Sequence, residues 1–444
     1  GVEDQRKINE LNTDYLLTDE EAEALRSDSR VLGVTDNSTK KIGRFAFQTS
    51  TFNKTTTETG EKSNWGLLRH TEDTNVFGTS TADPGGTYDY VLDGTGVDIV
   101  IIDSGIQADH PEFEDASNVS RVQQINWFTA SGVSGTMPTD FYTDYDGHGT
   151  HVAGTAAGKT FGWGKNAHIY SIKLSGLQGA SDPNSGLSDS QAFDCLLGWH
   201  NAKTNGRGTV LVNSWGYLVT WDVAQQALTF NESTYYSVTG GTYRGVSWSG
   251  AIKDPSKGHT GSQFATGKFR FSYPITSTNA DISQAITAGI VVCNAAGNNS
   301  VKHDVLGGVD YDNYVSSTGL SDFYYHRGGA PHVKGASGFQ VGAMGTNFVG
   351  SSEAKSSYSD SGPGVNIYAA GDRIISAMST SNADSSTFNY HLNSSFKQQI
   401  LSGTSMAAPQ IAGLCALLIQ AHPDWSVTQI YDWIIKNSKT ILYT

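Results

Sequence analysis

Cysteine is scarce in this sequence. Three of the 444 residues are cysteines, Cys195, Cys293 and Cys415, and no two of them form a CxxC pair. An odd number excludes a disulfide framework that uses every cysteine. Because each one lies in an apolar stretch, we expect buried side chains that pack as small hydrophobic groups.

Positive charge and long apolar runs are also lacking. The chain has 29 Lys and Arg residues against 43 Asp and Glu residues, a formal net charge of −14, and no Lys/Arg-rich block. Such a chain repels phosphate backbones, so we do not expect nucleic acid as a partner. No apolar run reaches the length of about 18 residues that a membrane span needs, so none is predicted.

Glycine, by contrast, is abundant. It accounts for 50 residues, and 37% of the chain is hydrophobic. This suffices for one large or two medium domains with many loops over a compact core. The composition favours a secreted protein or part of an extracellular particle such as a virion, without excluding an intracellular one. The start at Gly1, without an apolar signal segment, predicts a processed form of a longer product.

The N-terminal stretch has a pattern of its own. Residues 16–28, LLTDEEAEALRSD, predict a short amphipathic helix in which Thr18 is the N-cap and Glu21 completes a capping box. A short strand is predicted over residues 30–37. Residues 48–63 are polar, Thr-rich and aperiodic, which indicates a linker or processing region.

From residue 97 onward, apolar strands alternate with helical patterns. The expected strands are 97–103, 167–174, 209–215, 290–297, 338–344 and 365–371. The expected helices are 148–158, 188–204, 280–289, 405–421 and 427–437. This alternation predicts an α/β fold in which a mostly parallel central sheet has helices on both faces.

Two long segments interrupt the alternation. Residues 217–279 are rich in Tyr, Trp, Thr, Ser and Gly, and residues 299–337 contain HDVLGGVDYDNY and YYHRGGAPH. Both are interpreted as insertions at strand ends, where α/β enzymes build their sites.

Polar residues at the ends of strands and the starts of helices are the candidates for chemistry. Asp103 ends a buried strand, although it could instead cap a turn. His148 and His151 begin a helix, but zinc-binding helices usually place two His four residues apart with a Glu between them. The glycines beside His148 leave it room at the surface, whereas His151 suits a packed structural role.

Two further segments contain Asn298 and Ser405. Asn298 would be unremarkable as a turn residue, but its amide could donate a hydrogen bond to a developing oxyanion. Ser405 lies in LSGTSMAAPQIAG (401–413), where an uncharged first turn is not explained by capping alone. At a helix N-terminus this Ser gains from the positive end of the helix dipole, and Gly403 lets its amide face an oxyanion.

Taken together, these residues supply a nucleophile, a base and an orienting acid. A hydroxyl is a poor nucleophile at neutral pH without a base, and the base needs a carboxylate that fixes its tautomer. The order Asp103, His148, Ser405 is the order of the triad in subtilisin, one of three known chain orders.

The sequence resembles the subtilisin-like serine peptidases, or subtilases, and is nearest in its core to the proteinase K-like branch. The match rests on VIIDSGIQADHPEF, DGHGTHVAGTAAG, NSWG, NAAGN and GTSMAAP, spread over about residues 64–437. The resemblance implies a three-layer fold and a serine endopeptidase that cuts polypeptides through an acyl-enzyme. Asp103, His148 and Ser405 would form the triad, Asn298 would serve the oxyanion hole, and no cofactor would be required. It also implies the substrate-binding residues Ser214, Trp215, Gly216, Ala296, Gly297, Gly403 and Thr404.

Specificity is expected to be apolar or broad. The segments LSGTS and AAGN, which would line the pocket for the residue before the scissile bond, contain no charge. Trp215 stands where many family members have Leu, and it should narrow an apolar subsite further along the substrate.

The resemblance also divides the chain. Residues 1–48 resemble the last half of an inhibitory propeptide, residues 49–63 are a linker or processing region, and residues 64–444 are the catalytic domain. The propeptide segment would then be a partner of its own catalytic domain. The two insertions could support a homo-oligomer or a larger assembly.

Some residues depart from the family pattern. Gln410 follows SMAAP where the family usually has His, at a position behind the nucleophile. Residues 157–164 lack the insertion that forms one common calcium site. Structural calcium is still expected, without assigned residues. Clustered oxygen ligands occur in two acidic stretches, for which solvated loops are the alternative: Asp310 and Asp312, and Asp140, Asp144 and Asp146.

Two other functions compete with the endopeptidase. A structural or assembly component of a secreted complex or virus particle could use a subtilase scaffold, and the retained propeptide-like arm and large insertions favour it. The intact set of Asp103, His148, Asn298 and Ser405 argues against it. An esterase of another fold is disfavoured because no GxSxG motif surrounds Ser405.

Overall fold

The structure is a computed structural model of the chain. It describes residues 4–7, 13–15, 17–28, 30, 48–53, 64–69, 85–132, 134–137, 141–174, 186–222, 227–230, 234–249, 268–273, 275–319, 322–329, 338–349, 352–382, 387–440 and 442. The chain divides into two compact units, Gly1–Phe47 and Gln48–Thr444, each of which is described by itself.

The first unit contains a short hairpin and a helix. Strand β1 (Asp4–Lys7) pairs antiparallel with β2 (Thr13–Tyr15), and helix α1 spans Asp19–Arg26. The Thr18 hydroxyl accepts from the Glu21 backbone N, while the Glu21 carboxylate accepts from the Thr18 backbone N at 2.9 Å. The predicted helix and its capping box are therefore confirmed.

Part of the predicted linker is a strand. Strand β3 (Gln48–Asn53) pairs antiparallel with β4 (Gly85–Tyr90) in a two-stranded sheet. The β-branched Thr residues of this segment favour extended backbone, which accounts for a strand that its aperiodic pattern did not predict. The linker or processing role of residues 49–63 stays a prediction. The strand predicted over 30–37 lies outside the described residues, apart from Arg30.

The central sheet has the predicted, mostly parallel form. Its strand order is β17-β16-β14-β8-β5-β7-β6, with β18 also paired to β16. Only the β16–β17 pair is antiparallel among these pairings of described residues. The strands are β5 (Val97–Asp103), β6 (Val122–Gln124), β7 (His168–Lys173), β8 (Gly208–Asn213), β14 (Ile290–Ala295), β16 (Phe339–Val349), β17 (Ser352–Lys355) and β18 (Ile367–Ala370).

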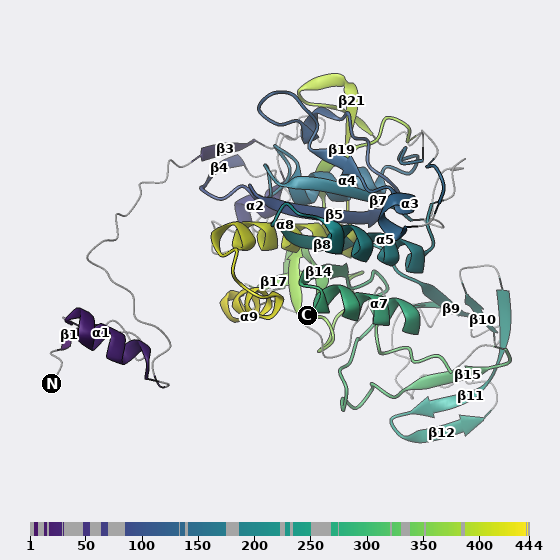
Figure 1. Cartoon of the computed structure of the whole chain (residues 1–444). Helices are drawn as coiled ribbons and strands as arrows, with labels where there is room; N and C mark the ends of the chain where they lie inside the picture. The colour runs from purple at the N-terminus through teal and green to yellow at the C-terminus, as the bar shows by residue number, and fades with distance from the viewer. Residues whose placement is uncertain are drawn as a thin grey trace. The chain divides into compact units, whose positions relative to one another are not determined.

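Helices cover both faces of this sheet, which confirms the three-layer α/β architecture. One layer contains α4 (His148–Ala157), α8 (Thr404–Ala421) and α9 (Val427–Asn437), and the other contains α3 (Trp127–Ser131), α5 (Asp189–Ala202) and α7 (Thr276–Thr287). Along β5, Ile99 and Ile101 pack with the first layer, while Val100 and Ile102 pack with the second. In Figure 1, α5 and α7 lie side by side on that second face.

The segment predicted to open the catalytic domain is buried in the fold. Helix α2 spans Trp65–Arg69, and the Trp65 indole donates to the Asp372 carbonyl at 2.8 Å. Asn64 and Gln410 exchange two side-chain hydrogen bonds of 3.0 Å each. Gln410 also accepts from the Trp163 indole at 2.5 Å, so it joins α8 to the start of this domain.

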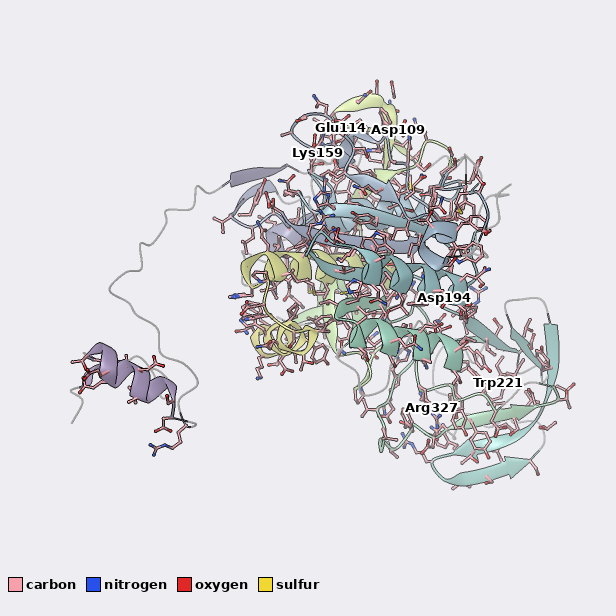
Figure 2. All side chains as sticks on the ribbon, in the orientation of Figure 1. Asp109, Glu114, Lys159, Asp194, Trp221 and Arg327 are labelled. Carbon is pink, nitrogen blue, oxygen red and sulfur yellow. The ribbon has the colours of Figure 1, made fainter. Side chains whose placement is uncertain are left out.

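The two predicted insertions fold together into a second, antiparallel sheet. Its order is β12-β11-β10-β9-β13, and β15, from the second insertion, pairs with β11 from the first. Trp221, Phe271, Val315 and Phe323 are buried in its own core, and Figure 2 labels Trp221 on this sheet. The strands are β9 (Leu218–Asp222), β10 (Ala227–Phe230), β11 (Thr234–Tyr243), β12 (Val246–Ser249), β13 (Lys268–Ser272) and β15 (Tyr314–Ser317).

A three-stranded sheet packs beside α4. It has the order β19-β21-β20, formed by β19 (Ile374–Met378), β20 (Phe388–Tyr390) and β21 (Asn393–Leu401). All three cysteines are buried and free, as predicted. Helix α8 is long and apolar enough to cross a bilayer by length and composition, but 72% of it is buried inside the fold, as in a core helix.

Candidate active site

The sheet brings the predicted residues to one edge. Asp103 is the last residue of β5, Ser214 follows β8, and Ala296 follows β14. These three strands are parallel neighbours, so their carboxyl ends meet at the same edge, where α/β folds bind ligands. His148 begins α4 and Ser405 is the second residue of α8, and these two helices pack against each other.

Asp103 and His148 are hydrogen-bonded. The distance between His148 Nδ1 and Asp103 Oδ1 is 2.8 Å, and the side chains are 27% and 1% exposed, respectively. Asp103 Oδ1 also accepts from the Ser104 backbone N at 2.8 Å. Because a carboxylate only accepts, Nδ1 carries the proton of a neutral His148, and Nε2 is left as the base.

Further carboxylates shape the turn before α4. Asp144 is buried and accepts hydrogen bonds from the Ser104 hydroxyl at 2.8 Å, from the Gly147 N at 2.7 Å and from the Thr150 N at 2.9 Å. Asp146 accepts from the backbone N of His148 at 3.1 Å. These bonds fix the position at which the His148 side chain leaves the backbone.

Asp103, Asp144 and Asp146 also raise the pKa of His148, the candidate base. Burial by itself lowers the pKa of His148, but the charge and hydrogen bond of Asp103 and the charges of Asp146 and Asp144 outweigh it and raise the pKa to about 9. His151 differs, since burial lowers its pKa to about 3 and its Nε2 lies 3.1 Å from two backbone carbonyls. The predicted structural role of His151 is confirmed.

Ser405 and Ser214 form two hydrogen bonds with each other, one donated by each hydroxyl. Ser405 Oγ donates to the Ser214 carbonyl at 2.9 Å, and Ser214 Oγ donates to the Ser405 carbonyl at 2.9 Å. The second bond follows from Pro409, which has no N–H to donate to the carbonyl four residues earlier in α8. Among the described residues, the Ser405 hydroxyl therefore bonds to Ser214 and not to His148, so the predicted triad is assembled only on its Asp103–His148 side.

The side-chain nitrogen of Asn298 and the backbone N of Ser405 both lie near Gly403. Asn298 Oδ1 accepts from the Thr404 backbone N at 2.9 Å and from its hydroxyl at 2.8 Å. Because a backbone N can only donate, this orients the carboxamide and leaves Nδ2 free to donate elsewhere. A Cβ built on Gly403 would lie 3.4 Å from Asn298 Nδ2 and 3.6 Å from the Ser405 N, so both nitrogens lie close to this glycine.

The remaining predicted substrate-binding residues line the ends of β8 and β14. Ser214 and Trp215 are buried, Gly216 is exposed, and the Trp215 ring meets Tyr217 edge-on at a centroid distance of 6.1 Å. Ala296 is buried, and the Gly297 N donates to the Thr404 hydroxyl at 3.1 Å.

The profile of the Subtilase family (Peptidase_S8) matches residues 94–442, most of the chain. This chain belongs to the subtilase family. A subtilisin-like protease of Coccidioides posadasii is 27% identical over 340 residues, which cover 76% of this chain and 56% of that protein. A cuticle-degrading serine protease of Orbilia oligospora is 25% identical over 334 residues, covering 75% of this chain and 52% of that protein.

The subtilase described here spans about half the length of these curated relatives. Among solved structures, a cold adapted subtilisin-like serine proteinase aligns with a TM-score of 0.49 and 21% identity, covering 86% of this chain and 94% of that one.

The carboxylates that the structure describes in the two acidic stretches of this subtilase have protein partners. Asp310 is engaged by Arg244 and Lys302, each at 2.7 Å, and Asp312 by Arg327 at 2.6 Å. Asp140 lies outside the described residues, and the oxygens of Asp144 and Asp146 accept the hydrogen bonds given above. Within the described parts of the chain, no group of three or more His, Cys, Asp and Glu side chains is arranged to hold a metal ion. Structural calcium stays a prediction without a site.

Sequence reasoning missed a buried pair behind the Asn298 turn. Asp360 and His303 are 0% and 1% exposed, and the distance between Asp360 Oδ2 and His303 Nε2 is 3.0 Å. Gly297, at a φ of +123°, permits the approach, because a Cβ there would lie 2.3 Å from Asp360 Oδ2. The only signal in the sequence was an Asp in a Ser- and Gly-rich loop, SYSDSGPG.

Proposed function

We propose that this subtilase is a serine endopeptidase that uses Ser405 as its nucleophile. The observation that carries the proposal is the Asp103–His148 hydrogen bond of 2.8 Å at the sheet edge where Ser405 begins α8. The carboxylate holds the tautomer in which Nε2 can accept a proton, and it stabilises the imidazolium that forms.

The reaction proceeds in two steps. His148 Nε2 takes the proton of the Ser405 hydroxyl as its Oγ attacks the peptide carbonyl, and His148 then gives that proton to the leaving amine. Asn298 Nδ2 and the Ser405 N stabilise the negative oxygen of the tetrahedral intermediate. Water, activated by the same imidazole, hydrolyses the resulting acyl-enzyme.

Substrate binding itself would release the nucleophile. An extended peptide that pairs with residues 214–216 presents a backbone N–H that competes for the Ser214 carbonyl. The Ser405 hydroxyl, which donates to that carbonyl at 2.9 Å in the free chain, is then free to turn toward His148. Apo enzymes often hold catalytic hydrogen bonds that align only in the complex.

The substrates would be polypeptides bound in extended form. Ala296, Gly403 and Thr404 carry no charged group, which supports apolar or broad specificity, and the buried Trp215 supports a narrowed apolar subsite. We further propose an extracellular location, which the Gly-rich composition supports. The relatives named as cuticle-degrading proteases support it as well. The propeptide-like role of residues 1–48 is proposed on sequence alone.

Labelling with a fluorophosphonate probe tests the proposal. Wild type should gain one probe mass by intact mass spectrometry, Ser405→Ala should gain none, and the neighbouring Ser402→Ala should label as wild type does. An unlabelled wild type would contradict an activated, accessible Ser405 and favour a scaffold. Labelling of Ser405→Ala would place the reactive group elsewhere.

A further inference from the structure

A buried carboxylate holds the turn that carries Asn298. Asp360 Oδ1 accepts hydrogen bonds from the backbone N of Asn299 and of Val301, both at 2.9 Å. The backbone N of Asp360 donates to the Gly297 carbonyl at 2.9 Å. One residue thus binds the chain on both sides of Asn298.

The second oxygen of Asp360 is held by both insertions. Oδ2 lies 3.0 Å from His303 Nε2 and 3.5 Å from the Ser272 hydroxyl. Ser272 is the last residue of β13 in the inserted sheet, and His303 belongs to the second insertion. The orientation of the carboxylate therefore depends on residues that the insertions contribute.

This arrangement bears on catalysis because an oxyanion donor acts only when it is held in place beforehand. The contacts of the Asn298 side chain with Thr404 orient the carboxamide, but they do not hold the backbone from which it leaves. Asp360 accepts from this backbone at two positions and donates to it at a third, so it is suited to hold that backbone.

We propose that Asp360, oriented by His303 and Ser272, is a positioning residue that fixes the Asn298 turn for oxyanion stabilisation and links the inserted sheet to catalysis. The inference rests on the proposed endopeptidase function, because positioning matters only if Asn298 stabilises an oxyanion.

Two substitutions of Asp360 test the proposal kinetically. Asp360→Ala should lower kcat on the order of tenfold with KM changed less than about twofold, because the interaction acts in the transition state. Asp360→Asn should recover most of kcat, since its amide oxygen can still accept from Asn299 and Val301. The matched control is Asp310→Ala, which removes a buried Asp of the second insertion that contacts Arg244 and Lys302; its kcat should be unchanged.

A double-mutant cycle separates positioning from general support of the fold. In an Asn298→Ala background, Asp360→Ala should lower kcat by less than about twofold, because its effect passes through Asn298. A tenfold loss in both backgrounds would overturn the proposal. So would an unchanged kcat in Asp360→Ala, or a change in KM alone.

Hydrogen exchange tests the turn independently of activity. In the Ser405→Ala background, Asp360→Ala should speed exchange of the Asn299 and Val301 amides by about tenfold or more, while Asp310→Ala should not. Unchanged exchange would overturn the proposal. If Asp360→Ala yields no folded protein, Asp360→Ser takes its place in both measurements. A wild type without peptidase activity would refute the proposed function, whereas the exchange rates would still report whether Asp360 holds the turn.

Discussion

At the scale of single residues, the charge state of His148 decides when the site can act. The imidazole must be neutral to take the Ser405 proton, and the surrounding carboxylates raise its pKa to about 9. We therefore expect kcat/KM on a short fluorogenic peptide to rise about tenfold per pH unit below that value and to level off above it.

Asp146→Asn provides the control for this pH dependence. It removes one of the charges that raise the pKa of His148 but keeps an oxygen for the His148 backbone N, so the rise in kcat/KM should move to lower pH. A profile that is flat between about pH 6 and pH 9 in wild type would contradict a catalytic His148 with this pKa.

The raised pKa of His148 also affects stability, with the opposite dependence on pH. Its ordinary pKa is 6.5, so the protonated His148 beside Asp103 stabilises the fold fully below about pH 6.5. That contribution is lost as the pH rises through about 9. The proposed enzyme is thus expected to be most active where this pair supports the fold least.

Trp215 is the residue on which substrate choice is predicted to depend. Trp215→Leu should enlarge the subsite, and kcat/KM for peptides with bulky side chains there should rise on the order of tenfold relative to small ones. Peptide-library profiling measures this ratio, and Trp248→Leu in the inserted sheet is the control that leaves it unchanged. An unaltered profile in Trp215→Leu would show that Trp215 lines no subsite.

The chemistry-bearing residues could be named from sequence because each lies in a distinctive motif at the end of a predicted strand or the start of a predicted helix. The hydrogen bonds between Ser214 and Ser405 could not be predicted from sequence. They depend on the Ser405 carbonyl, which Pro409 leaves without a helical donor, and on the position of β8 beside α8 in space. Asp360 was also missed, because its partners Asn299 and His303 are some 60 residues away in the chain.

At the scale of elements, the close packing of α4 and α8 brings the base and the nucleophile together. A Cβ on Gly413 would lie 2.5 Å from the Trp163 Cβ and 2.7 Å from the Ala156 carbonyl. Gly413→Ala should therefore push α8 from α4, lowering the free energy of unfolding by about 1–3 kcal/mol.

Denaturant unfolding in the Ser405→Ala background, where self-digestion is excluded, measures this effect. Gly338→Ala is the matched control, because its nearest neighbour would be Ile286 Cδ1 at 3.4 Å, an ordinary contact. Equal free energies of unfolding for the two variants would contradict the close approach of the helices.

Most core elements were predictable because their signals are local. The apolar-rich segment VDIVIID of β5 and the capping-box residues of α1 are visible in the sequence itself. Strand β3 and the inserted sheet were not predicted, since β-pairing between Thr-, Tyr- and Gly-rich segments depends on partners distant in the chain. The pairing of β15 with β11 joins two insertions that the sequence presents as separate.

At the scale of the whole molecule, a family fold that carries Asp103, His148, Asn298 and Ser405 supports an enzyme more than a scaffold. The inserted sheet has its own buried core, and its strand β13 ends at Ser272, whose hydroxyl lies 3.5 Å from Asp360 Oδ2. The insertions thus contact Asp360, which binds the Asn298 turn, and this contact fits the catalytic role proposed for Asp360.

Cleavage of a defined peptide library, with fragments identified by mass spectrometry, tests the central claim most directly. We predict that wild type cuts internal peptide bonds, with apolar residues favoured before the scissile bond, and that Ser405→Ala leaves every peptide intact. Equal cleavage by both proteins, or none by wild type at about pH 9, would contradict the assignment of this subtilase as a Ser405-dependent endopeptidase.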